Sequence, residues 1–192
     1  MELFNAIKEI DTQLFVFLNS KHNSFFDVVM YWFSHKLFWI PLYLFFFYLA
    51  FKKTGKQVWL VALATGLLIF LSDKISVHAF KNVFQRLRPC HELLIQANVH
   101  LQNGYCGSMY GFVSSHAANT FALAAFLSLL FQNRYKYFTP LVFLWAFFVS
   151  YSRIYNGVHY PGDILAGGLL GTGIGITVYK LYQIAQTKFF KN

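Results

Sequence analysis

The sequence predicts an all-α integral membrane protein: a helical bundle with about five to six spans and an N-terminal interfacial helix. Of the 192 residues, 57% are hydrophobic and only 12% are charged, whereas soluble domains carry about 25% charged residues. Long apolar segments recur along the chain, and most ionisable residues lie between them in short clusters. We interpret residues 1–192 as a single membrane-embedded domain.

The N-terminal segment, residues 1–20, is predicted to be an amphipathic helix that lies at the membrane surface. Lys8, Glu9 and Asp11 interrupt its apolar character, so it resembles neither a span nor a signal peptide. Its apolar residues recur at helical spacing, at Leu3, Ile7, Ile10, Leu14, Phe17 and Leu18.

The remaining apolar segments are the predicted spans. The first two, which "SHK" separates, form either a broken helix or one long tilted helix, and this leaves the number of spans at five to six. Each of the last four approaches the roughly 20 residues that cross a bilayer. The segments are 25–34, 37–51, 57–80, 115–132, 138–152 and 162–184.

The distribution of basic residues predicts the orientation. Residues 51–56, 133–137 and 188–192 are basic and are expected to face the cytoplasm. Residues 81–113 and 151–161 then share the outer face, together with the N-terminus if only five segments span. The net charge of +9 suits an anionic partner such as a phosphorylated lipid. Because the basic residues are scattered among apolar runs, the sequence argues against a nucleic-acid partner.

Three polar clusters are predicted to meet on the outer face. Ionisable groups at the ends of spans are costly unless they face a polar cavity, so three clusters at one depth indicate one shared site. They are "KNVFQRLRP" with Lys81, Arg86 and Arg88, "FVSSHAAN" with Ser114, Ser115 and His116, and "SRIYNGVHYPGD" with Arg153, His159 and Asp163.

The residue types in these clusters point to phosphoryl chemistry. Arg and Lys match phosphate oxygens, and the helix predicted to begin at Ser114 adds backbone N–H groups. Two histidines supply nucleophilic and acid–base chemistry, and Asp163 is spaced to hold the ring of His159. Taken alone, His159 and Asp163 would equally suit a structural pair at a helix start. For Arg86 we prefer a contact with lipid headgroups.

Together the clusters resemble the type 2 phosphatidic acid phosphatase (PAP2) superfamily. Its motif K-x6-R-P is matched by Lys81, Arg88 and Pro89, and S-R-x5-H-x3-D by Ser152, Arg153, His159 and Asp163. Its motif P-S-G-H is matched by Val113, Ser114, Ser115 and His116, with Val for Pro and Ser for Gly. We interpret the two replacements as a variation within the family.

The resemblance implies a helical lipid phosphatase that works without a metal or another cofactor. His159 would attack phosphorus, Asp163 would orient it, and His116 would protonate the leaving oxygen. The phosphoryl oxygens would be held by Lys81, Arg88, Ser114, Ser115 and Arg153.

The expected substrate is a phosphorylated lipid in the outer leaflet of a bacterial inner membrane, with the active site facing the periplasm. Our first choice is undecaprenyl pyrophosphate. The alternatives are the 1- or 4′-phosphate of lipid A, which the variant second motif and the paired cysteines favour by their resemblance to Gram-negative members, and phosphatidylglycerol phosphate. A lipid-phosphate carrier is the non-enzyme alternative. Besides membrane lipids, the sequence indicates no obligate protein partner.

Two further features concern structure. Cys90 and Cys106 fall in one outer loop, where an oxidising compartment favours a disulfide over two free thiols. Gly167, Gly171 and Gly175 recur every four residues and predict a face for close helix packing.

Overall fold

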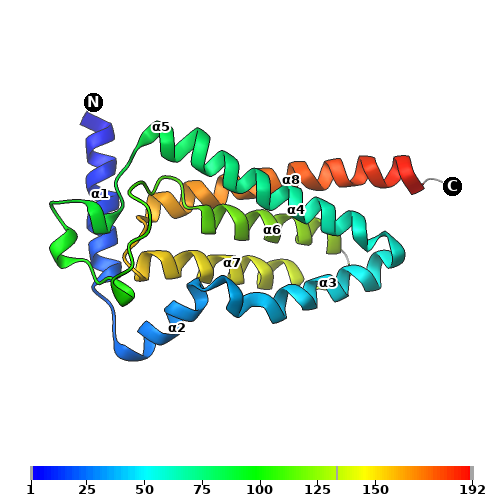
Figure 1. Cartoon of the computed structure of the whole chain (residues 1–192), viewed down its shortest axis with the longest axis horizontal. Helices are drawn as coiled ribbons and strands as arrows, with labels where there is room; N and C mark the ends of the chain where they lie inside the picture. The colour runs from blue at the N-terminus through cyan, green and yellow to red at the C-terminus, as the bar shows by residue number, and fades with distance from the viewer. Residues whose placement is uncertain (1, 133, 191–192) are drawn as a thin grey trace.

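The computed structural model describes residues 2–132 and 134–190, and its regular elements are helices packed into an elongated bundle (Figure 1). In the described part of the chain the β-structure is limited to an isolated bridge between Leu87 and Tyr110. The π-helix Ile75–Lys81 continues α4 without a break. The α-helices are α1 (Glu2–Asn19), α2 (Ser24–Ser34), α3 (Ile40–Thr54), α4 (Val58–Lys74), α5 (Asn82–Phe84), α6 (Ser115–Phe131), α7 (Phe138–Tyr155) and α8 (Pro161–Phe190).

Among the described residues, three segments are long and apolar enough to cross a membrane: Lys36–Phe84, Phe138–Tyr155 and Pro161–Phe190. The first contains a reversal at Gly55, whose φ of +56° favours glycine, so α3 and α4 run side by side in opposite directions (Figure 1). The apolar helix α6 is shorter, at 17 residues. The chain is therefore a membrane protein of helices, while a count of five or six crossings stays a prediction.

The segment before α3 is broken. Helix α2 ends at Ser34, His35 is extended, and a short 3-10 turn, Lys36–Trp39, leads into α3. Pro41 lies in the first turn of α3, where its missing N–H costs nothing. Of the two arrangements that the sequence left open, the structure has the broken helix rather than the long tilted one.

Helix α6 occupies the centre of the bundle and packs against α4, α7 and α8. Its contact with α8 depends on the glycine stripe, because a Cβ atom at Gly171 or Gly175 would overlap the backbone of α6 at Ala118 or Ala122. The predicted packing role of the stripe is confirmed. At Gly167 a Cβ would lie 2.6 Å from the Ser114 carbonyl oxygen, so the same stripe sets the distance between the starts of the two helices.

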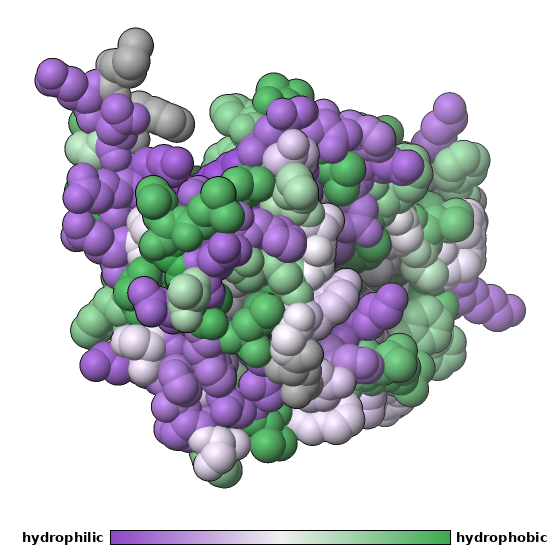
Figure 2. Space-filling view, turned by 60° about the vertical axis from the view of Figure 1, so that its left-hand side comes forward, coloured by the Kyte–Doolittle hydropathy of each residue, from purple (hydrophilic) through white to green (hydrophobic). Residues whose placement is uncertain are grey.

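One end of the bundle carries α1, the loop between α5 and α6, and the α7–α8 connection (Figure 1). Helix α1 lies across this end and is anchored by Asn19, which is buried and donates to the carbonyl oxygens of His100, Ile154 and Tyr155. Hydrophilic and hydrophobic side chains alternate over this part of the surface (Figure 2). The predicted outer segments 81–113 and 151–161 thus share one end with the N-terminal helix, and the basic α3–α4 turn lies at the other.

Candidate active site

The three polar clusters predicted from the sequence meet at this end of the bundle. Lys81 ends the π-helix that extends α4, Arg88 follows in the loop, and His116 lies in the first turn of α6. Arg153 lies in the last turn of α7, and His159 precedes α8. The site is therefore assembled from helix ends, where ionisable side chains avoid the free-energy cost of lying in the apolar part of the membrane.

His159 and Asp163 form a buried pair. Pro161 starts α8, which places Asp163 in the first turn, and its Oδ2 lies 3.2 Å from His159 Nδ1. The same oxygen accepts the backbone N–H of Tyr160 at 3.1 Å. The two side chains are 2% and 0% exposed, so the carboxylate holds the imidazole in one orientation.

Arg88 defines the protonation state of this histidine. Its Nη1 lies 3.2 Å from His159 Nε2, and a guanidinium can only donate. Nε2 is therefore the acceptor, and Nδ1 carries the proton that it donates to Asp163. Burial holds the pKa of His159 well below its ordinary value, and the positive charge of Arg88 lowers it further. The imidazole is thus neutral at neutral pH, with the Nε2 lone pair directed into the cation cluster.

Several cationic groups surround this lone pair. Arg88 also donates to the Val158 carbonyl and to Ser108 Oγ, both at 3.2 Å. The Nε atoms of Arg88 and Arg153 are buried without a hydrogen-bond partner among the described residues. Buried donors left unpaired are costly, and phosphate oxygens would satisfy them.

The helix start at Ser114 lies next to these cations. Ser114 caps α6 by accepting from Ala117 N, and its own N–H donates to the Asp163 carbonyl at 3.0 Å. Lys81 donates to Ser115 Oγ at 2.9 Å. The serine that replaces the motif glycine is thus held by the lysine of the first motif.

His116 and Arg153 lie on the side of α2. Arg153 donates to Ser34 Oγ, and His116 is within electrostatic reach of Arg153, His159 and Lys81. The structure therefore brings together all eight predicted site residues. It also joins Cys90 and Cys106 in a disulfide, with Cα atoms 6.0 Å apart, in the loop between Arg88 and Ser114.

The sequence interpretation of Arg86 is wrong. Instead of reaching for headgroups, Arg86 pairs with Asp163 Oδ1 at 3.0 Å and with Asp11 of α1 at 2.8 Å. Its guanidinium carbon also lies 3.9 Å from the ring centre of Tyr160. One signal was available: Arg86 and Arg88 are two apart in an extended segment, so they lie on the same side of it. No feature of the sequence around Asp11 indicated that this residue would dock against Arg86.

A second group of ionisable residues lies outside this site. His22, Asp27 and His100 bring potential metal-ligand atoms within 4.8 Å of one another. Asp27 Oδ1, however, already accepts from Tyr155 and lies next to His100 Nε2, both at 2.8 Å. Burial acts to raise the pKa of Asp27, but these two hydrogen bonds outweigh it and hold the pKa below its ordinary value.

Comparison with known proteins decides the family. The profile of the PAP2 superfamily matches residues 57–186. The chain belongs to the PAP2 superfamily. The match covers α4, α6, α7 and most of α8, and so contains the three clusters, whereas α1 and Asp11 lie outside it.

Individual relatives of this PAP2 protein extend the comparison. It is 40% identical over 174 residues to a lipid A 4′-phosphatase of Bacteroides thetaiotaomicron, covering 88% of the chain and 75% of that protein. It is 35% identical over 184 residues to a lipid A 4′-phosphatase of Porphyromonas gingivalis, covering 95% of the chain and 77% of that protein.

Two solved structures share the fold. The crystal structure of Aquifex aeolicus LpxE superposes with a TM-score of 0.63 at 26% identity, over 88% of this chain and 93% of that one. A PAP2-type phosphatidylglycerolphosphate phosphatase from Bacillus subtilis superposes with a TM-score of 0.69, over 97% of this chain and 89% of that one. At 19% identity, the second likeness concerns the fold alone.

Proposed function

We propose that this membrane phosphatase of the PAP2 superfamily removes the 4′-phosphate of lipid A. The observation that carries the proposal is the 40% and 35% identity to two lipid A 4′-phosphatases over 88% and 95% of the chain. The first choice from the sequence, undecaprenyl pyrophosphate, has no support among these relatives. Lipid A, the alternative stated there, takes its place.

The proposed reaction has two steps. His159 Nε2 attacks phosphorus, the bond between phosphorus and the lipid oxygen breaks, and His116 donates a proton to that oxygen. A water molecule then gives a proton to His116 and attacks the phosphohistidine, which breaks the P–N bond and releases inorganic phosphate. Asp163 supports the first step in two ways. It accepts a hydrogen bond from Nδ1–H, which keeps the proton on Nδ1 and leaves Nε2 as the nucleophile, and its charge stabilises the cationic ring that forms.

The phosphoryl oxygens are proposed to bind between Arg88, Arg153, Lys81 and the start of α6. In this scheme Arg88 exchanges its contact with His159 Nε2 for a phosphoryl oxygen when substrate enters. The exchange frees the Nε2 lone pair for attack and places the Arg88 guanidinium on the phosphoryl oxygens, whose negative charge it then stabilises. The unpaired Nε atoms of Arg88 and Arg153 support this assignment.

We further propose that the site faces the periplasm from the inner membrane. The basic α3–α4 turn lies at the opposite end of the bundle from the α7–α8 connection, which contains His159 (Figure 1), and basic loops favour the cytoplasm. The phosphate of a lipid in the outer leaflet would then lie level with the cation cluster.

The test is phosphate release by the purified protein in detergent with EDTA. The substrates are bis-phosphorylated lipid A, undecaprenyl pyrophosphate and phosphatidylglycerol phosphate, and mass spectrometry of the product identifies which lipid A phosphate is lost. Release is expected from the 4′ position, and both His159→Ala and His116→Ala should abolish it. His78→Ala is the matched control, because His78 is exposed on the π-helix.

Three results would contradict the proposal in different ways. Loss of the 1-phosphate instead would overturn the position, and preference for undecaprenyl pyrophosphate would overturn the substrate. Binding of lipid phosphates without any release would indicate the carrier.

A further inference from the structure

We infer that Asp11 of α1 is a positioning residue of the active site, which acts on His159 through Arg86 and Asp163. The inference rests on the phosphatase chemistry proposed above. It makes the N-terminal helix, which lies outside the part of the chain that matches the superfamily, a component of the catalytic machinery.

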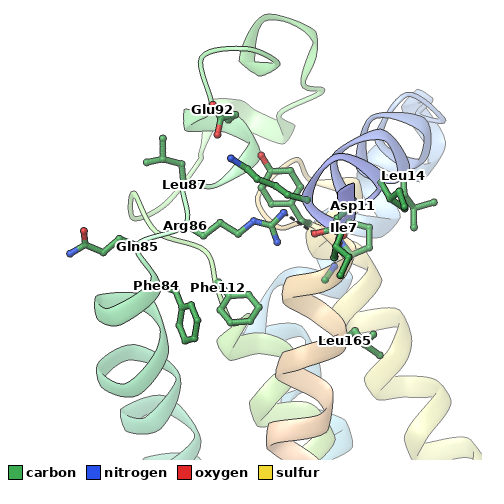
Figure 3. A pocket seen from close by; sticks show the side chains of 15 residues that line it. Ile7, Asp11, Leu14, Phe84, Gln85, Arg86, Leu87, Glu92, Phe112 and Leu165 are labelled. Atoms are coloured by element: carbon green, nitrogen blue, oxygen red, sulfur yellow. Dashed lines mark hydrogen bonds and ion pairs between the residues drawn. The ribbon is translucent and has the colours of Figure 1, made fainter. Parts of the chain in front are cut away.

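The contacts form a continuous chain from α1 to the nucleophile. Arg86 Nη2 lies 2.8 Å from Asp11 Oδ2, and Arg86 Nη1 lies 3.0 Å from Asp163 Oδ1. Asp163 Oδ2 lies 3.2 Å from His159 Nδ1. Figure 3 shows Arg86 extending from the loop after α5 to meet Asp11 on α1. The guanidinium is therefore clamped between two carboxylates, one on each side.

Asp11 has a second attachment, at the start of α8. Its Oδ1 accepts the backbone N–H of Gly162 at 2.7 Å. The positive end of a helix favours a carboxylate at this position. A Cβ atom on residue 162 would lie 2.7 Å from Asp11 Oδ2, so a side chain there would displace the carboxylate. This contact gives a reason for Gly162 directly before Asp163.

The clamp also forms a barrier. A cavity of about 820 Å³ lies between α1, α5 and the start of α8, and Arg86, Asp11 and Tyr160 line it. Lys8 and Glu92 are the other charged residues on its walls, and neither His159 nor Asp163 reaches it. Arg86 lines the cavity and also pairs with the buried carboxylate of Asp163, so it lies between the two. Without Asp11, the guanidinium loses one of its two anchors and can swing into the cavity.

A swing of Arg86 would leave Asp163 Oδ1 without its partner. The carboxylate is then held through Oδ2 alone and can rotate. The orientation in which it holds the imidazole of His159 is no longer fixed. Misplacing a reacting group by about 1 Å can cost about 100-fold in rate. The effect should fall on kcat, because the groups proposed to hold phosphate are not members of the chain of contacts.

The experiment compares full-length variants in lipid A 4′-phosphate release. We expect Asp11→Asn to lower kcat by about 10- to 100-fold with KM within about threefold, and Asp11→Glu to recover most of the loss. Gly162→Ala should reproduce the defect, because its methyl group displaces the same carboxylate. Glu9→Gln is the matched control on the exposed face of α1 and should leave kcat unchanged.

A double-mutant cycle separates positioning from general damage to α1. If Asp11 acts through Arg86, Asp11→Asn adds nothing to the loss caused by Arg86→Gln. Additive losses, or an Asp11→Asn variant with the kcat of the wild type, would overturn the inference while leaving the phosphatase proposal intact.

A binding measurement keeps the two proposals distinguishable even if the wild type releases no phosphate. Vanadate mimics the phosphoryl group in transfer and requires an oriented nucleophile, whereas inorganic phosphate requires the cations alone. Asp11→Asn should weaken vanadate binding by about tenfold more than phosphate binding. Equal weakening of both would count against a positioning role.

Discussion

Replacing Asp163 by Asn tests the proposed protonation scheme most directly. The side chain keeps its size but exchanges one acceptor oxygen for an NH₂ donor. At present Oδ1 faces the Arg86 donor, and Oδ2 faces both His159 Nδ1 and the Tyr160 N–H. All three neighbours donate, so at least one of them must meet the new NH₂ group whichever way the amide turns.

Each orientation of the introduced amide is costly. With the NH₂ toward His159, the ring must accept at Nδ1 and carry its proton on Nε2, where it meets the Arg88 donor at 3.2 Å. The nucleophilic lone pair is then lost. With the NH₂ toward Arg86, the half-buried guanidinium faces another donor and keeps only the carboxylate of Asp11. The same substitution in Ser-His-Asp hydrolases lowers kcat by about 10⁴ through the wrong tautomer. We expect about 10³- to 10⁴-fold here, or about 4–5.5 kcal/mol of activation free energy.

The assay measures kcat at saturating lipid A and, separately, the single-turnover conversion of lipid A to its dephosphorylated form with enzyme in excess, which reports the first chemical step. Asp73→Asn is the control, since Asp73 accepts from Asn119 and an Asn can still accept there. A kcat for Asp163→Asn within tenfold of the wild type would refute the tautomer argument. The acid-quenched phosphoenzyme should also disappear, and its persistence at wild-type levels would point to another nucleophile.

Three further predictions concern folding. Gly171→Ala should lower the stability by about 1–3 kcal/mol through overlap with the α6 backbone, whereas Gly173→Ala, with open space around it, should not; thermal unfolding in detergent measures both. Because the pKa of Asp27 is lowered in the folded protein, its contribution to stability is present above the ordinary value of 3.8 and is lost as the pH falls through the folded pKa. The melting temperature should therefore fall less between about pH 5 and 2 in Asp27→Asn than in the wild type. Replacing both Cys90 and Cys106 by Ser should cost about 3 kcal/mol of loop constraint, and an unchanged melting temperature after reduction of the wild type would contradict that role.

The sequence predicted which residues gather in the candidate site, because phosphoryl transfer needs particular residue types at short spacings. His159 and Asp163 are four residues apart, and one helix start is enough to bring them together. Lys81 and Arg88 lie at the end of one helical segment, so their shared location also follows from local structure. The glycine stripe of α8 follows in the same way from the helical repeat.

The number of crossings was harder to predict because length and hydropathy do not distinguish a buried helix from a lipid-facing one. Helix α6 illustrates the difficulty: it has 17 residues, many of them alanines, and is surrounded by α4, α7 and α8. The break at His35 was visible as the polar residues of "SHK". Whether the chain would bend there or continue depended on packing against α7.

The sequence alone determined that the protein is an apolar helical bundle with polar motifs between its apolar segments, because apolar segment length and clustered cations are local properties. The tertiary structure alone decided that Arg88 contacts Nε2 of His159 and that Arg86 joins Asp11 to Asp163. The reason is physical: these contacts depend on how α1 docks across the bundle and on the path of an extended loop. No residue spacing encodes the distance between groups so far apart in the chain.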